Sequence, residues 1–412
     1  MRLTDASLAA VFFAASASLL AQQTAPPASG AGGLNLQFTP ADPTQTYGAL
    51  PLNPSAIAPP ASDFAPAKPA TPEKKRGTEF LAAPIPISNP TLGTGLAVVA
   101  ALIFPLSRED KVSPPTVAGV GGFYTSNHSY AAAVAMRPYF AEDRWRLLGF
   151  AGFGSLNYNF FGIGGVSNVS IPIDQKFSGF DFEALRRVSK GFYLGARYFL
   201  AHSTLTLGTS SEEAEPPPAK DFSVQTAALG LVAQTDSRDS TFYPAKGSYF
   251  TLKADFYDPV FASDRTFQRY QADYNKYFLI GERQVFAVRA SLCDVAGDAP
   301  VYSLCLFGSG NDLRGYEVGK YLDRSMLAAQ GEYRLMLPES LGFFGRFGFV
   351  LFGGVGEVAH SFSDFDSDKL LPAGGLGIRF LLARENRVNF RIDYAWGKSG
   401  NRGLYVGVGE AF

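Results

Sequence analysis

The 412-residue sequence has little cysteine, little histidine and, beyond its N-terminus, no apolar run long enough for a membrane helix. Two Cys and three His spread over the chain exclude a zinc framework. A helical membrane protein is excluded because no later stretch reaches about 18 uninterrupted apolar residues. Lys and Arg number 36 against 37 Asp and Glu, so the net charge is −1. Such a chain has no basic field with which to bind nucleic acid.

Motifs of enzyme chemistry are missing as well. The sequence contains no G-x-S-x-G and no Gly-rich loop that would join a strand to a helix. His128, His202 and His360 lie far apart, and the neighbours His202 and Ser203 would point to opposite faces of a strand. We therefore expect no enzyme activity, no cofactor and no metal site.

What the sequence does contain is apolar and aromatic. Apolar residues make up 46%, aromatic residues 14% and charged residues only 18%, with 43 Gly and 36 Phe. This composition is unusual for a soluble domain. A chain too aromatic for a soluble protein and too interrupted for membrane helices is typical of an outer-membrane β-barrel, so we expect localisation in the bacterial outer membrane.

Two N-terminal segments precede the expected barrel. Residues 1–21 are predicted to be a signal peptide, cleaved after Ala17 or Ala21, with an uncleaved anchor as the alternative. Residues 22–78 are predicted to be a disordered linker rich in Pro and Ala. Eleven of the 27 Pro fall in this stretch, which cannot bury a core.

Residues 79–412 are predicted to form the transmembrane β-barrel. Apolar and polar residues alternate, most clearly in 387–396, where Phe390, Ile392 and Tyr394 share one face and Arg391 and Asp393 the other. The polar face carries charges of both signs, as expected of a wet lumen: Asp181, Glu183, Arg197, Lys253, Asp255, Asp273, Arg289, Glu332, Arg334, Arg379, Arg391 and Asp393.

Sixteen strands are expected, with both chain ends on the periplasmic side. Tight turns, as at 189–191, alternate with longer loops, as at 295–324, which is the pattern of outer-membrane barrels. The expected strands are residues 80–88, 93–106, 114–126, 128–141, 144–161, 176–188, 191–204, 223–235, 247–258, 265–280, 284–295, 325–337, 344–359, 373–382, 387–398 and 402–412.

Several motifs resemble those of the BamA/TamA superfamily of outer-membrane assembly and translocation barrels. The segment LFGSGNDLRGYEVGKYLDRSMLAAQGEYRLML, from residue 306, resembles the sixth-loop signature, in which Leu313, Arg314, Gly315 and Tyr316 match (V/L/I)RG(F/Y). DSRDSTFYPAKGSYF (236–250) and FFGIG (160–164) are similar to a periplasmic turn and a strand exit of that family. The last strand, with Tyr405, Gly407 and Phe412, resembles an outer-membrane sorting signal.

This resemblance implies a sixteen-stranded antiparallel barrel whose sixth extracellular loop folds inward. The chain looks like a bacterial surface antigen-type member without POTRA modules, because the Pro/Ala-rich linker leaves no room for them. In the family the loop arginine docks on acidic wall residues. Alternate residues of a strand face the lumen, and this alternation places Asp393 and Glu332 on the lumen side as partners of Arg314. It places Glu357 on the opposite face of its strand, so Glu357 should not reach Arg314. Two departures are Gly354, where the family has an Asp, and Glu410, close to the terminal Phe.

Two further features leave alternatives open. Cys293 and Cys305 bracket the start of the sixth loop and would pair in an oxidising compartment, or would remain two free thiols. Gly403, Gly407 and Gly409 either weaken the last strand at a seam or are ordinary glycines on a lumen face.

Three functions are compatible with these observations. The chain either aids insertion or translocation of protein or lipid through a lateral seam, or is a channel or structural barrel that lost that role, or is a surface phospholipase-type enzyme. The first is favoured by the intact Arg-Gly-Tyr loop. The expected partners are outer-membrane lipid and lipopolysaccharide, together with unfolded outer-membrane or secreted proteins.

Overall fold

The computed structural model describes residues 78–89, 91–165, 170–207, 221–240, 243–308, 312–383 and 387–412. The predicted signal peptide and all of the predicted linker before Thr78 lie outside these residues. Within them the chain forms strands and short 3-10 helices only. None of the described helices could span a membrane.

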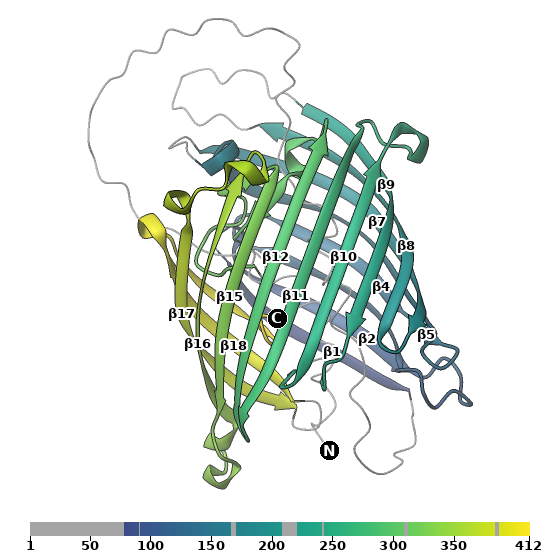
Figure 1. The fold of residues 1–412 in the computed structure, drawn as a ribbon, viewed down its shortest axis with the longest axis vertical. Helices are drawn as coiled ribbons and strands as arrows, with labels where there is room; N and C mark the ends of the chain where they lie inside the picture. The colour runs from purple at the N-terminus through teal and green to yellow at the C-terminus, as the bar shows by residue number, and fades with distance from the viewer. Residues whose placement is uncertain are drawn as a thin grey trace, which may run out of the picture.

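One large antiparallel sheet curls into a nearly closed barrel, whose first and last strands lie beside each other (Figure 1). Its strands are β1 (Glu79–Asn89), β2 (Gly93–Phe104), β3 (Thr116–Thr125), β4 (Tyr130–Arg137), β5 (Tyr139–Phe140), β6 (Trp145–Phe160), β7 (Ile171–Ser189), β8 (Phe192–Leu207), β9 (Asp221–Asp236), β10 (Gly247–Tyr257), β11 (Phe267–Gly281), β12 (Gln284–Gly297), β15 (Ser325–Met336), β16 (Phe347–Ala359), β17 (Leu371–Ala383), β18 (Val388–Gly397) and β19 (Arg402–Val408).

The remaining elements lie in turns and loops. A small hairpin of β13 (Cys305–Phe307) and β14 (Tyr321–Asp323) belongs to the loop after β12. The 3-10 helices are η1 (Ile163–Gly165), η2 (Pro259–Phe261), η3 (Val301–Ser303), η4 (Glu339–Leu341), η5 (Phe344–Arg346), η6 (Phe362–Asp364), η7 (Ser367–Lys369) and η8 (Lys398–Gly400).

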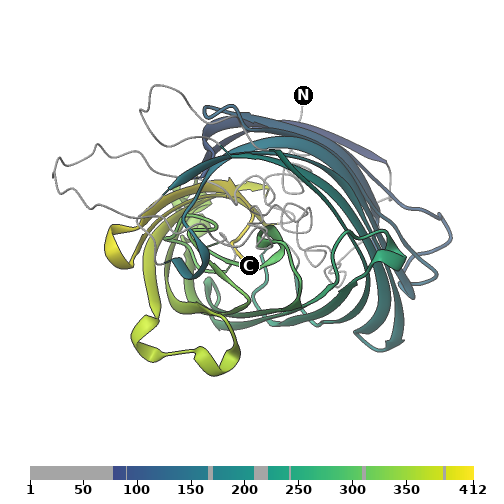
Figure 2. The ribbon, with the colours of Figure 1, turned by 90° about the horizontal axis from the view of Figure 1, so that it is seen from above.

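The barrel has sixteen strands, as the alternation predicts, because β4 and β5 are two parts of one strand. Both pair with β6 in a single register, with Met136 opposite Gly149 and Tyr139 opposite Arg146. Pro138 lies between the two parts, and proline has no backbone N–H to donate to the ladder. Seen from above, the strands form a ring, and the segment after β12 lies inside it (Figure 2).

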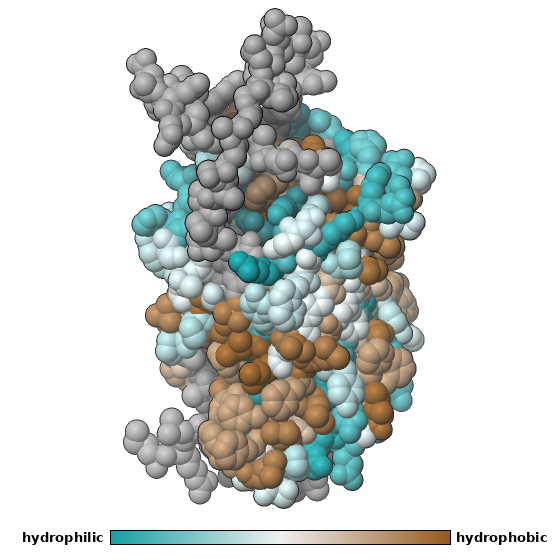
Figure 3. Space-filling view, turned by 90° about the vertical axis from the view of Figure 1, so that its left-hand side faces the viewer, coloured by the Kyte–Doolittle hydropathy of each residue, from teal (hydrophilic) through white to brown (hydrophobic). Residues whose placement is uncertain are grey.

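Alternation along the strands sends apolar side chains outward and polar side chains into the lumen. On β18, Ile392 and Trp396 are exposed on the outer face, whereas Arg391 and Asp393 are buried inside. Arg197 on β8 shows how the lumen accepts charge, because its guanidinium lies 2.8 Å from Asp181 and 2.6 Å from Asp255. Figure 3 shows apolar residues gathered over the lower half of one wall, with hydrophilic residues above. The outer surface therefore suits a hydrocarbon solvent.

Two expected strand ends are wrong. The sixth strand of the barrel, β7, begins at Ile171 rather than at 176, so the preceding loop is shorter than expected. The last strand ends at Val408 rather than at 412. Gly409 has φ +88°, a left-handed conformation that a strand cannot continue through, and the chain leaves the barrel wall there.

A barrel of this kind should resist unfolding in SDS at room temperature, because every wall strand except β1 and β19 is paired on both sides. We expect the unheated protein to migrate differently from the boiled protein on SDS gels and to give a β-type circular dichroism spectrum in detergent. A helical spectrum, or recovery of the protein in a soluble fraction, would contradict this fold.

Candidate functional site

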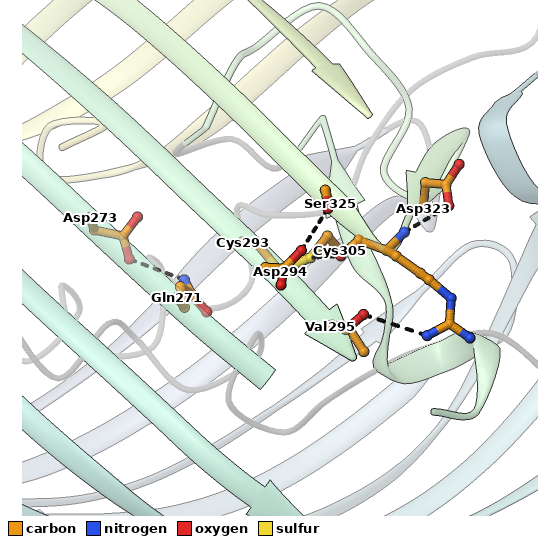
Figure 4. Close-up of a disulfide and its surroundings, with 9 residues drawn as sticks. Gln271, Asp273, Cys293, Asp294, Val295, Cys305, Asp323 and Ser325 are labelled. Carbon is orange, nitrogen blue, oxygen red and sulfur yellow. Dashed lines mark hydrogen bonds between the residues drawn. A yellow bond between two sulfur atoms is a disulfide. The ribbon is translucent and has the colours of Figure 1, made fainter. Parts of the chain in front are cut away.

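The loop after β12 is covalently fastened to the wall at its start. Cys293 on β12 and Cys305 on β13 form a disulfide, with their Cα atoms 5.7 Å apart (Figure 4). Next to it, the Ser325 hydroxyl donates a 2.6 Å hydrogen bond to Asp294 and thereby joins the start of β15 to the end of β12. The base of the loop is thus fixed between these two strands.

Beyond the disulfide, apolar side chains pack the loop inside the lumen. Phe307, Leu313 and Leu322 are completely buried. The rings of Phe307 and Tyr316 lie 5.2 Å apart, and this cluster continues onto side chains of the wall strands, including Phe199 on β8. Burial of this apolar surface holds the loop in the barrel interior.

Arg314 lies at the inner tip of this loop, between the two carboxylates expected from parity. Its Nη1 atom is 2.5 Å from Asp393 on β18, and its Nη2 atom hydrogen-bonds Glu332 on β15. The guanidinium also stacks on Phe352 of β16, 3.5 Å from the ring centroid. All three charged side chains have zero solvent exposure. A guanidinium fork matched to two carboxylates is the favoured geometry for a buried arginine.

The residues after Arg314 fit the wall closely. Gly315 has φ +121°, and a Cβ there would lie 3.1 Å from the Cβ of Ala373, so the position requires glycine. The Tyr316 hydroxyl donates to the carbonyl of Pro372 at 2.5 Å and accepts from the Lys398 backbone N–H. Burial raises the pKa of Tyr316 to about 12, so this hydroxyl stays protonated and remains a donor.

Tyr405 connects the loop to the last strand. Its hydroxyl accepts the Gly315 backbone N–H at 2.8 Å and donates to the Tyr316 carbonyl at 3.2 Å. The sequence assigned Tyr405 to a sorting signal. Tyr405 is two residues from both Gly403 and Gly407, so all three lie on the same face of the strand. This spacing could have placed Tyr405 on the lumen face, opposite the loop.

Glu332 is the centre of the charged cluster on the wall. One carboxylate oxygen binds Arg314, and the other accepts from Arg334 at 2.7 Å and lies 3.7 Å from Arg379. Arg379 in turn contacts Asp393 at 2.5 Å. The cluster therefore ties the loop to β15, β17 and β18 at once.

The C-terminal tail, residues 409–412, adds a third carboxylate to this cluster. Glu410 accepts hydrogen bonds from Arg379 and Asn389, both at 2.7 Å. Arg334 donates to the backbone oxygen of Phe412 at 2.7 Å. The tail turns into the lumen after Gly409, and Figure 2 places the C-terminus within the ring. This explains the acidic residue that is unexpected so close to the chain end.

The position where the family has an aspartate could not hold one here. A Cβ at Gly354 would come within 2.3 Å of the Ala329 carbonyl. Glu357, excluded by parity, accepts instead from the Asp366 backbone N–H at 3.0 Å. Glu332, Asp393 and Glu410 therefore supply the carboxylates of the cluster around Arg314.

The seam between β19 and β1 differs from every other strand boundary. The two strands lie beside each other, yet among the residues that the structure describes no backbone ladder joins them, whereas β1 pairs with β2 from Glu79 to Asn89. Pro84 and Pro86 lie within that ladder, opposite Val98 and Leu96.

The two prolines define which backbone groups face the seam. A continuous antiparallel ladder uses the N–H groups of alternate residues. Since Pro84 and Pro86 have no N–H, the donors to β2 must be the odd-numbered residues, Ile85 among them. The even-numbered positions then face β19, and two of them lack a donor. The edge of β1 can therefore form only part of a ladder with any neighbouring strand.

A serine and a histidine meet elsewhere on the outer wall. The Ser223 hydroxyl lies 3.0 Å from Nε2 of His202 and 3.0 Å from the Thr204 hydroxyl. In the part of the chain that the structure describes, the other ring nitrogen of His202 has no hydrogen-bond partner. A hydrolase triad needs a group there to orient the imidazole.

These features define a class: a sixteen-stranded membrane barrel filled by its own loop, with an arginine of that loop bound to wall carboxylates. The chain belongs to the Omp85 superfamily, whose domain matches residues 116–412. The resemblance to BamA/TamA barrels is thereby confirmed at the level of the superfamily. Among curated proteins, none matches this sequence.

Solved structures show the same fold at low identity. BamA from Haemophilus ducreyi, lacking POTRA domains 1–3, is 13% identical with a TM-score of 0.54, and the match covers 84% of this chain and 75% of that one. CdiB from Escherichia coli is 12% identical with a TM-score of 0.53, covering 82% and 63%. CdiB from Acinetobacter baumannii is 11% identical with a TM-score of 0.50, covering 80% and 59%. The chain thus spans less than two thirds of either CdiB.

Replacing Arg314 by Ala should destabilise the barrel and free the loop. Breaking a buried ion pair costs about 3–5 kcal/mol, because a charge is left unpaired. Glu332→Ala should lower the free energy of unfolding more than Arg314→Ala, because Glu332 contacts three arginines. The free energy of unfolding in urea measures the cost, and protease cleavage within residues 306–322 measures loop release.

The double variant Arg314→Ala/Glu332→Ala should lose less than the sum of the single losses, because the two residues share one interaction. Lys253→Ala is the control, since Lys253 pairs with Glu183 at 3.3 Å elsewhere in the lumen. It should leave protease access to the loop unchanged. Additive losses would mean that the loop is not held through Arg314.

Glu410→Gln should release the C-terminal tail. Hydrogen bonds to a charged group contribute about 1.5–3 kcal/mol, and the substitution removes the charge that Arg379 faces. We expect faster amide hydrogen exchange at residues 409–412 and a lower urea midpoint. Asp298→Asn, in a solvent-exposed pair with Arg265, should change stability by less than about 1 kcal/mol. Equal exchange in both variants would contradict a tail held by Glu410.

Proposed function

We propose that this protein aids insertion or translocation of protein at the bacterial outer membrane through the β1–β19 seam. The observation that carries the proposal is the absence of a ladder between these two strands in the described part of the chain. In hydrocarbon, each unsatisfied backbone group costs several kcal/mol. The seam is accordingly the boundary at which the wall parts most easily.

The loop is placed to control that boundary. Arg314 binds Asp393 on β18, and Gly315 and Tyr316 bind Tyr405 on β19. A docked loop therefore holds the last two strands in place from inside. Withdrawal of the loop removes these contacts, and the ladder with β18 is then the remaining strand pairing of β19 among the described residues.

The clients we propose are unfolded outer-membrane or secreted proteins. A strand of such a protein carries a full set of N–H and C=O groups and can satisfy an open strand edge by adding to it. Lipid and lipopolysaccharide are the solvent on the outer side of the seam. We propose no catalytic role, because the Ser223–His202 pair lacks a group to orient the imidazole among the described residues.

The test is to supply the missing donors of β1. Pro84→Val/Pro86→Val adds two N–H groups on the seam edge, and each hydrogen bond formed with β19 should add about 0.5–1.5 kcal/mol. We expect slower amide exchange at residues 402–408 and a higher unfolding temperature. In cells depleted of the natural protein, this variant should restore the outer-membrane proteome less well than the unaltered protein.

Ala82→Val is the matched control. It places the same side chain on the same edge and outer face, at a residue that already has an N–H. It should leave both amide exchange and complementation unchanged. If the double variant closes the seam, by the exchange measurement, and still complements fully, then the seam does not open in function. The protein would in that case be a channel or structural barrel.

A further inference from the structure

The outer wall has one large apolar hollow that the proposed function leaves unused. It has a volume of about 780 Å³ and is lined almost entirely by apolar atoms of β1, β2, β3, β4, β6 and β7. Ligand pockets in proteins have volumes of about 300–1,000 Å³. The hollow is therefore of a size that accommodates a ligand, and it is open toward the membrane.

Strand register creates the hollow by aligning small side chains between large ones. Two rows cross the wall on its outer face. The first is Leu102, Ala118, Met136 and Gly149, and the second is Ala100, Val120, Val134 and Ala151. At one end Phe80 lies opposite Leu102, and at the other Phe182 and Phe180 lie opposite Gly149 and Ala151. Phe80 therefore bounds the hollow on one side, and Phe180 and Phe182 bound it on the other.

Gly149 lies at the floor of the hollow, and the space over it is empty. A Cβ added to this glycine would meet no atom within 4 Å. At most other strand glycines the added carbon would lie close to a neighbouring strand, as at Gly154, where it would be 2.4 Å from a carbonyl. The space above Gly149 is therefore open, and a larger side chain fits there without moving the backbone.

The hollow lies toward the end of the barrel at which β1 and β6 begin, the end that we expect to face the periplasm. On β6, Gly149 is four residues from Trp145, where the strand begins. Four residues span about 13 Å of strand, which is a depth of about 10 Å at the usual tilt of barrel strands. One leaflet of the hydrocarbon core is about 15 Å thick. The hollow thus lies at the level of the acyl tails of the periplasmic leaflet.

A cationic side chain and an aromatic ring lie between the hollow and the nearer end of the barrel, at the level of the lipid headgroups. Arg186 on β7 pairs in register with Trp145 on β6, and its guanidinium lies 5.7 Å from the centroid of the Trp145 ring. Both side chains are on the outer face, and the described residues include no ion pair to Arg186. Arginine binds phosphate through its planar fork, and tryptophan favours the membrane interface.

We propose that this face binds one diacyl phospholipid of the periplasmic leaflet. Its phosphate contacts Arg186, and its tails occupy the hollow over Gly149 and Ala151 between Phe80 and the pair Phe180 and Phe182. The apolar lining matches the tails, and the charge of Arg186 is complementary to the phosphate. The proposal goes beyond the proposed function and requires of it the outer-membrane location alone.

Native mass spectrometry of the full chain tests this proposal. The protein is folded into vesicles of phosphatidylethanolamine and phosphatidylglycerol at a 9:1 ratio, extracted in detergent, and titrated with phosphatidylglycerol. We expect one retained phospholipid per barrel. Gly149→Leu, which fills the floor, and Arg186→Gln, which removes the charge, should each weaken binding at least tenfold.

Gly353→Leu is the matched control. Gly353 is also exposed on the outer face, on β16, and a Cβ there would meet its nearest atom at 3.6 Å. This variant should bind like the unaltered protein. Equal binding by all four proteins, or equal loss in the control, would overturn the site and leave only the general lipid layer.

Two points keep the outcome interpretable. Ala151→Leu replaces Gly149→Leu if the latter fails to show a heat-dependent gel shift. The mass spectrometry needs a folded barrel but not a seam that opens. A variant can therefore retain the phospholipid and fail to complement depleted cells. Another can complement them and retain no phospholipid. Failure of the phospholipid site is therefore distinguishable from failure of the proposed function.

Discussion

The structure depends on the need to satisfy every backbone N–H and C=O in a solvent that offers no hydrogen bonds. Strand pairing meets this need along fifteen of the sixteen strand boundaries, each of which is joined by an antiparallel ladder. Among the described residues the exception is the β1–β19 boundary, where Pro84 and Pro86 remove N–H donors from the edge of β1 that faces β19. The same constraint that closes the barrel therefore concentrates its weakness at one seam.

The lumen is governed by a second constraint, the cost of burying charge. Arg314 enters a space from which water is largely excluded, and it is stable there because Glu332 and Asp393 are both within hydrogen-bond distance and Phe352 covers its face. Those carboxylates are shared with arginines of the wall. Loop, wall strands and C-terminal tail consequently form one network, and a change at Glu410 reaches the loop through Arg379 and Asp393.

Much of the fold and part of the site could be predicted from the sequence. Period-two alternation fixes which face each strand residue occupies, and this places Glu332 and Asp393 in the lumen and excludes Glu357 as a partner of Arg314. The course of the C-terminal tail was not predictable in this way. Glu410 follows a run that alternates like a strand, and only the turn at Gly409 shows that the tail leaves the wall.

The sequence by itself determined the barrel, the number of its strands and the acidic partners available to Arg314, because alternation and turn spacing are local properties of the chain. The tertiary structure decided what depends on neighbours distant in sequence. It brings Tyr405 to Gly315 and aligns Gly149 with Phe182 beneath an open hollow. In the described part of the chain it also leaves β19 beside β1 without a backbone ladder. These outcomes follow from register and closure, which arise only when strands from opposite ends of the chain meet.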